Sequence, residues 1–315
     1  ILHPLRRVGR KGEGRFARIS WDEALEEIAG RLRRIIDEHG GEAIWPYWGT
    51  GTLGWIQGGN GHAGRRLFNV LGASRHHYSI CSIAGSHGLT YTTGTSAGID
   101  PESLARAKLI ILWGTNPLTS GHHLWKFVQD ARKNGAYVVA IDPIRTRTAR
   151  QADLHLAPLP GTDAALALGL MNVIVGLGAE DRAYLAARTL GWEEFRERIA
   201  QFPPQRVARI TGLPEADIVA LGERIARTRP TAIRATMGLQ RHGGGGAALR
   251  ALACLPAVTG DWALPGGGLS YSTDDHYPID RAALFRDDLR PARTREQTAT
   301  ALAARFIIPL GNTWA

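Results

Sequence analysis

The feature that most restricts the fold is an alternation of apolar, strand-like runs with helical patterns. Buried strands are expected at residues 109–112, 137–141 and 152–156, with helices at about 120–133 and 164–175. Consecutive parallel strands need a crossover long enough to hold a helix, so this order predicts a doubly wound, mostly parallel sheet. We therefore expect an α/β fold with its ligand site at the carboxyl ends of the strands.

Polar, turn-forming clusters follow the predicted strands at those carboxyl ends. Each cluster alone is typical of an ordinary turn between strand and helix, but several in succession favour a binding site. A further strand at 231–234 leads into a similar cluster and then into a helix at 247–258. The candidate residues are Trp113, Gly114, Thr115, Asn116 and Pro117, then Asp142, Pro143 and Arg145, then Gly161, Thr162 and Asp163, and finally Met237, Gly238 and Arg241.

One of the two cysteines, Cys81, lies in a glycine-rich segment that carries no carboxylate between Glu42 and Asp100. A helix is expected directly after it, over residues 84–91. A thiol at a helix N-terminus has its thiolate form favoured by the helix dipole, as a metal ligand or nucleophile requires. Packing as a small buried apolar residue is the alternative for Cys81. The other cysteine, Cys254, lies in an apolar stretch and is expected in the core.

Residues 49–54 match the GxGxxG pattern of dinucleotide-binding turns. In a nicotinamide site an acidic residue follows about 20 positions later and binds the ribose. The acid-free segment excludes such a residue, so the sequence argues against a nicotinamide dehydrogenase.

The flanking segments also carry signals of secondary structure. Ser20 and Glu23 form a capping box, which predicts a helix ending at the glycine pair 40–41. Further expectations are a short strand at 43–48, a helix at 63–71 with Leu67, Val70 and Leu71 on its inner face, helices across 180–229, and a helix near 294–306.

Composition limits the remaining function classes. The formal net charge is +9, but the basic residues are dispersed and mixed with acids, which disfavours nucleic-acid binding. No apolar run is long enough to insert into a membrane. Two cysteines without CxxC spacing exclude a self-contained zinc or iron–sulfur site and argue against a disulfide-stabilised fold.

Taken in order, the clusters resemble the catalytic chain of molybdopterin-guanine-dinucleotide oxidoreductases, the dimethyl sulfoxide reductase family. The motifs occur in the order of that family across residues 1 to about 270. They are residues 19–25, Cys81 with Gly85 and Gly94, residues 113–117, 141–143 and 160–163, Met237-Gly238 with Arg241-His242, and Thr259-Gly260 followed by residues 265–268.

The resemblance implies a role for each candidate residue. Cys81 stands where the family places its protein ligand to molybdenum, and His77 stands in the approach to the metal. Residues 113–120 and 142–147 correspond to loops that hold the guanosine and pyrophosphate arm of the cofactor. Asp163 matches a residue that contacts guanine, and Met237 and Arg241 correspond to pterin contacts.

The resemblance also implies an organisation. Residues 108–229 would form a Rossmann-like domain that binds the pterin dinucleotide, inserted into an α/β domain of residues 1–107 and 230–315 that carries the metal-ligand loop. The four-cysteine iron–sulfur module and the C-terminal pterin domain of the family have no counterpart in this sequence. We therefore expect a fragment of a longer catalytic subunit, with a 4Fe-4S cluster bound elsewhere in the full-length protein.

The expected function is a two-electron oxygen-atom or hydride transfer on a small substrate, with molybdenum or tungsten bis-molybdopterin guanine dinucleotide as cofactor. An electron-transfer partner or subunit is expected, without nucleic acid or direct membrane insertion. The alternative is a non-catalytic scaffold or electron-transfer subunit that kept the fold and lost the cofactor. Ser82 after the candidate ligand, where formate dehydrogenases usually carry histidine, speaks against formate. The substrate and the compartment stay open.

Overall fold

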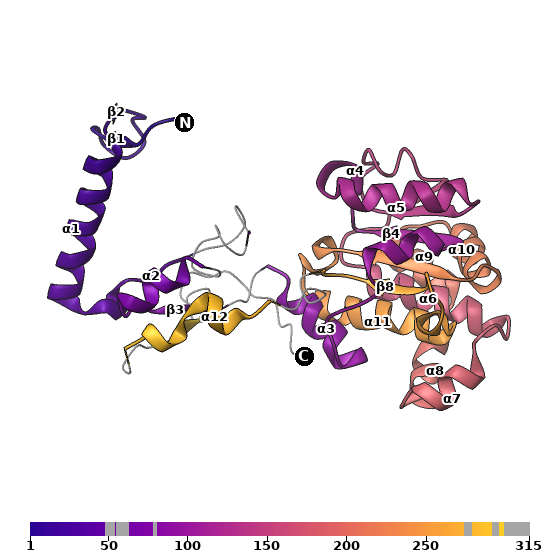
Figure 1. The fold of residues 1–315 in the computed structure, drawn as a ribbon. Helices are drawn as coiled ribbons and strands as arrows, with labels where there is room; N and C mark the ends of the chain where they lie inside the picture. Colours follow the sequence, from indigo (N-terminus) through magenta and orange to yellow (C-terminus); the bar gives the residue numbers. More distant parts are fainter. Residues whose placement is uncertain (48–53, 55–62, 78–80, 274–278, 292–295, 299–315) are drawn as a thin grey trace. The chain divides into compact units, whose positions relative to one another are not determined.

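The computed structural model describes residues 1–47, 54, 63–77, 81–273, 279–291 and 296–298. Contacts within the chain define two compact units (Figure 1). The flanking unit comprises residues 1–78 and 279–305, and the sheet unit comprises residues 79–278 and 306–315. Residues 79–278 therefore interrupt the sequence of the flanking unit.

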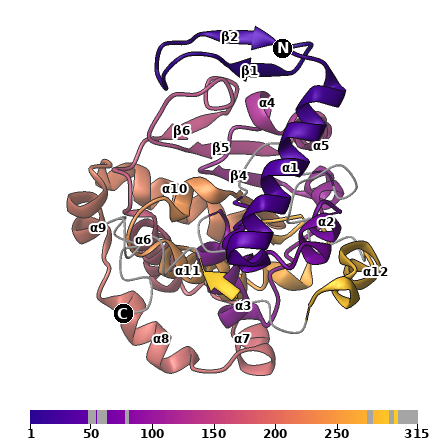
Figure 2. The ribbon, with the colours of Figure 1, turned by 90° about the vertical axis from the view of Figure 1, so that its left-hand side faces the viewer.

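The sheet unit is built on a five-stranded parallel sheet with the order β6-β5-β4-β7-β8. All residues of the central strand β4 are buried. The chain runs outward from β4 through β5 to β6 and then returns to the other side of β4, so the direction of winding reverses between β4 and β7. Figure 2 shows β4, β5 and β6 side by side. The strands are β4 (Leu109–Trp113), β5 (Tyr137–Ile141), β6 (Leu154–Leu156), β7 (Thr231–Ala235) and β8 (Gly268–Ser270).

Helices cover both faces of this sheet, as the alternating pattern predicts. Helix α5 (His122–Lys133) packs on one face, where Trp125 and Val128 contact the cluster that contains Ile110 and Leu112. Alternate residues of β4 point to the opposite face, where α6 (Asp163–Gly176), α10 (Glu215–Arg227) and α11 (Gly245–Val258) build the larger core. The doubly wound α/β fold is thus confirmed.

The remaining elements of the sheet unit connect or border these layers. Residues 180–229 are helical as predicted, and the helix α3 that follows Cys81 packs against α11. The elements are α3 (Ile83–Thr93), η2 (Pro101–Arg106), α4 (Pro117–Ser120), α7 (Arg182–Arg188), α8 (Trp192–Ala200), α9 (Pro204–Thr211), η3 (Met237–Gln240) and η4 (Asp261–Ala263).

In the flanking unit, segments from the two ends of the sequence are joined. Asn69 is buried, and its amide donates to the carbonyls of Phe285 and Arg286 and to the Asp287 carboxylate, at 3.0, 3.3 and 3.0 Å. The strands β3 and β9 pair in parallel. The elements are β1 (Leu5–Arg7), β2 (Phe16–Arg18), α1 (Trp21–His39), η1 (Gly41–Ala43), α2 (Arg65–Val70), β3 (Arg75–His77), α12 (Arg281–Phe285), η6 (Asp287–Leu289) and β9 (Glu296–Thr298).

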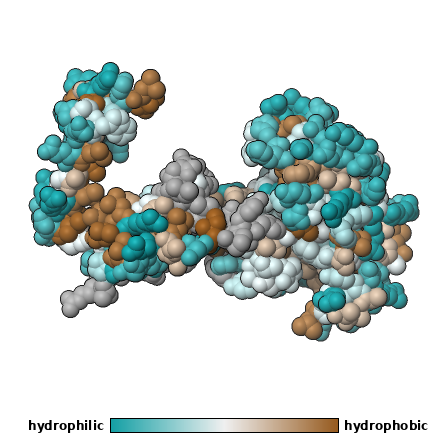
Figure 3. Space-filling model, in the orientation of Figure 1, coloured by the Kyte–Doolittle hydropathy of each residue, from teal (hydrophilic) through white to brown (hydrophobic). Residues whose placement is uncertain are grey.

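The flanking unit agrees only in part with the sequence-based expectations. The capping box is confirmed, since Glu23 N–H donates to Ser20 Oγ at 3.1 Å and Ser20 N–H donates to the Glu23 carboxylate at 2.7 Å. The predicted inner face of α2 is wrong for Leu67 and Val70, which are more than half exposed. Apolar side chains of α1 are exposed as well, and brown apolar surface is visible on this unit in Figure 3.

Two predicted elements are absent where the structure describes the chain. Residues 44–47 form no strand, because η1 ends at Ala43 and Pro46 has no N–H for a strand ladder. Residues 296–298 form β9 and not a helix, because they pair with β3. The GxGxxG pattern lies outside the described residues except for Gly54.

The sheet extends beyond the segment 108–229 that the sequence predicts as the dinucleotide-binding domain. β7 and β8 lie after residue 229, and they complete the sheet by pairing with β4 and with each other. The contact-defined units therefore differ from the predicted boundaries, and the assignment of dinucleotide binding to residues 108–229 stays a prediction. Among the described residues, no helix combines the length and apolar character needed to cross a bilayer.

Candidate functional site

The candidate site lies where the winding of the sheet reverses, at the carboxyl ends of β4 and β7. Thr236 Oγ1 donates to the carbonyl oxygen of Gly114 at 2.6 Å, which ties the two strand ends together. A Cβ on Gly238 would lie 3.0 Å from the same oxygen, and Gly114 itself has φ 59°. Glycine is therefore suited to both positions. In a doubly wound sheet this crevice is the ordinary place for a bound ligand.

The predicted residues Trp113 and Asp163 meet beside this crevice. The Trp113 indole N–H donates to Asp163 Oδ1 at 2.8 Å, and His242 Nε2 lies 3.7 Å from Asp163 Oδ2. Burial raises the pKa of the Asp163 carboxyl, although the bond from Trp113 and the nearby His242 act in the opposite direction. Asp163 is thus a largely buried hydrogen-bond acceptor, and burial raises the free energy of its ionised form.

The loops after β4 and β5 are joined by a second set of hydrogen bonds. Thr148 Oγ1 donates to Asn116 Oδ1 at 2.6 Å, and the Asn116 amide donates to Thr119 Oγ1 at 3.0 Å. Asp142 Oδ1 accepts the N–H of Ile144 at 2.9 Å. Pro143 and Arg145 are exposed on this loop, so the Arg145 guanidinium is available to an anion.

The other predicted residues lie in the core or in the turn before α6. Thr115 and Pro117 are buried, and Met237 packs against the larger core. Thr162 Oγ1 donates to the carbonyl of Leu159 at 2.6 Å and does not cap α6. A Cβ on Gly161, which has φ 87°, would lie 3.3 Å from His242 Nδ1.

Cys81 precedes α3, as predicted, and its loop is held to the turn after β7. Gln240 Nε2 donates to the carbonyl oxygen of Cys81 at 2.7 Å. The Gln240 Oε1 atom accepts the N–H of Gly85 at 2.6 Å and the hydroxyl of Tyr271 at 2.5 Å. The candidate metal ligand is therefore brought to the same end of the sheet as Gly114 and Gly238.

Cys81 has few companions as a metal ligand. The described residues contain no group of three or more histidine, cysteine, aspartate or glutamate side chains arranged to hold a metal ion. Cys81 is half-buried and forms no disulfide. His77 is the last residue of β3, in the flanking unit, so its predicted role near the metal stays a prediction. A metal at Cys81 would need most of its ligands from a bound cofactor.

Four contacts of this site were not predicted from the sequence. Gln240 and Tyr271 hold the Cys81 loop, His242 faces Asp163, and His155 Nε2 lies 2.8 Å from the Asp142 carbonyl oxygen. For the Gln240 contact, the only signal in the sequence is a polar residue beside Arg241 in the turn after a strand. Tyr271 follows β8, a strand of three residues that is too short to detect by periodicity.

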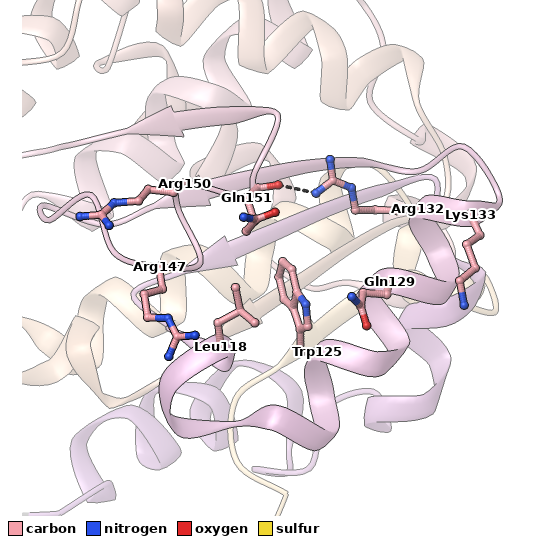
Figure 4. Close-up of a pocket in the computed structure, with 8 residues that line it drawn as sticks. All are labelled: Leu118, Trp125, Gln129, Arg132, Lys133, Arg147, Arg150 and Gln151. Atoms are coloured by element: carbon pink, nitrogen blue, oxygen red, sulfur yellow. Dashed lines mark hydrogen bonds between the residues drawn. The ribbon is translucent and has the colours of Figure 1, made fainter.

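A basic groove runs from the end of the site along α5 (Figure 4). Arg132 pairs with Asp153 at 2.8 Å and donates to the Gln151 carbonyl, and Lys133 pairs with Asp130 at 2.9 Å. Within the described part of the chain, Arg147 and Arg150 pair with no carboxylate, and they lie at the end of the groove near Leu118. Anionic groups are therefore favoured at that end. The lining residues are Leu118, Trp125, Gln129, Arg132, Lys133, Arg147, Arg150 and Gln151.

The raised pKa of Asp163 gives a stability prediction. The folded protein holds the carboxyl proton more tightly than the unfolded chain, so the contribution of Asp163 to stability falls as pH rises through the raised pKa. At pH 7 the ionised carboxylate therefore costs stability. Asp163→Asn keeps an acceptor for the Trp113 indole, and we expect it to raise the free energy of unfolding at pH 7, with a smaller difference at pH 4. Urea unfolding at both pH values measures this effect; a less stable variant at pH 7 contradicts it.

Known proteins resemble this chain in sequence and in structure. Residues 1–293 match the profile of the family described as molybdopterin oxidoreductase. The chain is 42% identical over 294 residues to the probable oxidoreductase YoaE of Bacillus subtilis, covering 93% of this chain and 43% of the relative. It is 36% identical to the dimethyl sulfoxide reductase DmsA of Escherichia coli, covering 85% of this chain and 36% of DmsA.

A solved structure is similar as well. The acetylene hydratase of Pelobacter acetylenicus matches with a TM-score of 0.64 and 30% sequence identity, over 86% of this chain and 37% of that protein. The chain thus spans about two fifths of the length of these relatives.

Proposed function

The chain belongs to the molybdopterin oxidoreductase family, and we propose that it forms the cofactor-binding core of a molybdenum or tungsten enzyme. The reaction proposed for the full-length protein is a two-electron oxygen-atom or hydride transfer on a small substrate. The observation that carries this proposal is the position of Cys81, a single thiol held at the carboxyl end of the sheet by Gln240. A lone soft ligand suits a metal whose other ligands come from a dithiolene-bearing pterin.

The residues fit a large, polyanionic cofactor. Arg145 is exposed on the loop after β5, and Arg147 and Arg150 of the next turn lack carboxylate partners in the described chain, so three cations are available for phosphates. Gly114 and Gly238 permit the two strand ends to pack closely against each other. We propose that the loops 113–117 and 142–145 hold the pyrophosphate arm.

The guanine end of the cofactor is assigned to the turn after β6. The Asp163 carboxylate suits the two adjacent N–H donors of a guanine ring, because Trp113 occupies only one of its acceptor positions. Gly161 and Thr162 form the turn that carries it. Met237, Gly238 and Arg241, in and after η3, are proposed to contact the pterin.

When bound, the cofactor supplies the two-electron chemistry at its metal, and the protein orients it and controls access. Cys81 contributes one ligand to the metal, and His77 is proposed to move a proton during turnover. The iron–sulfur cluster and an electron-transfer partner belong to the proposal for the full-length protein. Two relatives are named for different reactions, as a dimethyl sulfoxide reductase and an acetylene hydratase, so neither substrate is assigned to this chain.

The test uses the full-length protein purified from cells supplied with molybdate or tungstate. We expect about one metal atom per chain, together with GMP released from the cofactor by acid hydrolysis. Reductive titration is expected to show that the metal centre accepts two electrons. Metal and GMP at background level would contradict the proposal and favour the alternative, a scaffold that lost its cofactor. Metal and GMP without turnover-linked reduction would support a hydratase-like reaction instead of redox chemistry.

A further inference from the structure

Gln240 contacts both ends of the turn that carries Cys81. The residue is 9% exposed, its Nε2 donates to the Cys81 carbonyl oxygen at 2.7 Å, and its Oε1 accepts the Gly85 N–H at 2.6 Å. Cys81 precedes the N-cap residue of α3, and Gly85 lies in the first turn of the helix. One amide therefore satisfies a carbonyl before the helix and an N–H within it.

Only a side-chain amide offers this combination at the required length. Glutamine has a carbonyl oxygen that accepts and an NH2 group that donates, whereas a carboxylate accepts only and a thioether does neither well. Because the groups are buried, an acceptor or donor left without its partner would be costly. The turn is thus specified by the chemistry of Gln240 and not only by its volume.

The position of the Gln240 side chain is itself fixed by its surroundings. Tyr271 donates its hydroxyl to Oε1 at 2.5 Å, and burial raises the pKa of Tyr271, so the hydroxyl stays protonated at neutral pH. A Cβ on Gly245 would lie 2.3 Å from Gln240 Cα. A Cβ on Gly85 would lie 2.3 Å from the Tyr271 oxygen and 2.7 Å from Gln240 Oε1. Both glycines therefore permit a close contact that larger residues would prevent.

We propose that Gln240, supported by Tyr271, is a positioning residue that fixes Cys81 in the orientation needed to bind the metal. This inference rests on the proposed function, in which Cys81 is a metal ligand. A residue that orients a metal ligand typically changes metal affinity or activity by about 10- to 100-fold. Gln240 acts through the backbone of the loop, by its hydrogen bonds to the Cys81 carbonyl oxygen and the Gly85 N–H.

The test compares three variants of the full-length protein with two independent readouts. Gln240→Met removes all three hydrogen bonds, Gln240→Glu keeps the two accepting positions and loses the donor to Cys81, and Tyr271→Phe removes only the hydroxyl. The first readout is the alkylation rate of Cys81 by iodoacetamide in metal-free protein, followed by mass spectrometry on the peptide that contains Cys81, so that other cysteines do not contribute. The second is kcat and KM of the metal-loaded protein, with its metal content.

We expect Gln240→Met to raise the alkylation rate about two- to tenfold, because the loop opens more often. In loaded protein it should lower kcat by about 10- to 100-fold and change KM by less than about threefold. Gln240→Glu should have an effect of the same order, because a carboxylate oxygen would face the Cys81 carbonyl oxygen, and Tyr271→Phe should have the smallest effect. An alkylation rate and a kcat at the native level in Gln240→Met would overturn the proposal.

A matched control variant tests whether the effect of Gln240 is only a loss of stability. Val207 is fully buried in α9, away from the Cys81 loop, and Val207→Ala should lower the thermal unfolding midpoint without changing alkylation or kcat. If Val207→Ala changes both readouts as much as Gln240→Met does, the effect is general destabilisation and the proposal is wrong. The alkylation rate of Cys81 can be measured without a cofactor. Absence of metal from the native protein would therefore contradict the proposed function, but the effect of Gln240 on the Cys81 loop could still be measured.

Discussion

Replacing Cys81 by alanine in the full-length protein is expected to lower turnover by at least about 100-fold. This loss exceeds the range typical of residues that only orient a ligand, because the variant removes the atom proposed to bind the metal. The fold should persist, since the hydrogen bonds from Gln240 reach the carbonyl of residue 81 and the N–H of Gly85, which the substitution leaves in place. Steady-state turnover and metal content of the purified protein measure the effect.

Cys254 provides the matched control for this experiment. It lies in α11, packed against the larger core, and burial raises the pKa of its thiol to about 11, so it is a poor metal ligand at neutral pH. Cys254→Ala should keep native turnover and lose about 1 kcal/mol of stability through the small cavity it leaves. Full turnover in Cys81→Ala would remove the ligand assignment, while the family assignment would stand.

A Cys81→Ser variant refines the same argument. Serine offers an oxygen at nearly the same position, but oxygen is a harder ligand than sulfur and the hydroxyl is rarely ionised at neutral pH. We therefore expect metal to be retained with an altered absorption spectrum and with turnover between those of the native protein and Cys81→Ala. A native spectrum in this variant would show that the sulfur does not contact the metal.

The parallel sheet was predictable because its strands are buried on both faces. β4 and β5 read as uninterrupted apolar runs, with α5 between them in the sequence, and α6 follows β6. β8 escaped prediction because three residues carry no periodicity, and it forms only by pairing with β7. The strands of the flanking unit were also difficult to predict, because β3 and β9 are short and lie far apart in the sequence.

The sequence predicted that the candidate residues gather at one end of the sheet, but not the contacts between them. Turn-forming residues follow successive strands in the sequence, and of these Gly114 and Gly238 meet at the carboxyl end of the sheet. The bonds from Trp113 to Asp163 and from Gln240 to Cys81 join residues 50 and 159 positions apart. No local pattern encodes such pairs, because they depend on the order in which strands enter the sheet.

Gly88→Ala is expected to weaken the contact that holds α3, and Cys81 with it, against α11. Gly88 is buried in α3, and a Cβ there would lie 2.3 Å from the carbonyl oxygen of Gly246 in α11. The neighbour is backbone, so it cannot rotate away, and the helices must separate. Overpacking of this kind typically costs about 1–3 kcal/mol. The thermal unfolding midpoint should fall, and metal content should fall with it.

Gly176→Ala separates this steric effect from the general effect of replacing glycine in a helix. Gly176 is the last residue of α6 and is exposed, and a Cβ at this position would have no neighbouring atom within 4 Å, so alanine meets free space there. Alanine has the higher helix propensity, and we expect stability to be unchanged or raised by up to about 1 kcal/mol. Opposite signs for the two variants would show that the close approach of α3 and α11 determines the choice of glycine at position 88. If both variants change stability equally and by little, α3 adjusts its position freely. A rigid placement of Cys81 would then not explain the proposed metal binding.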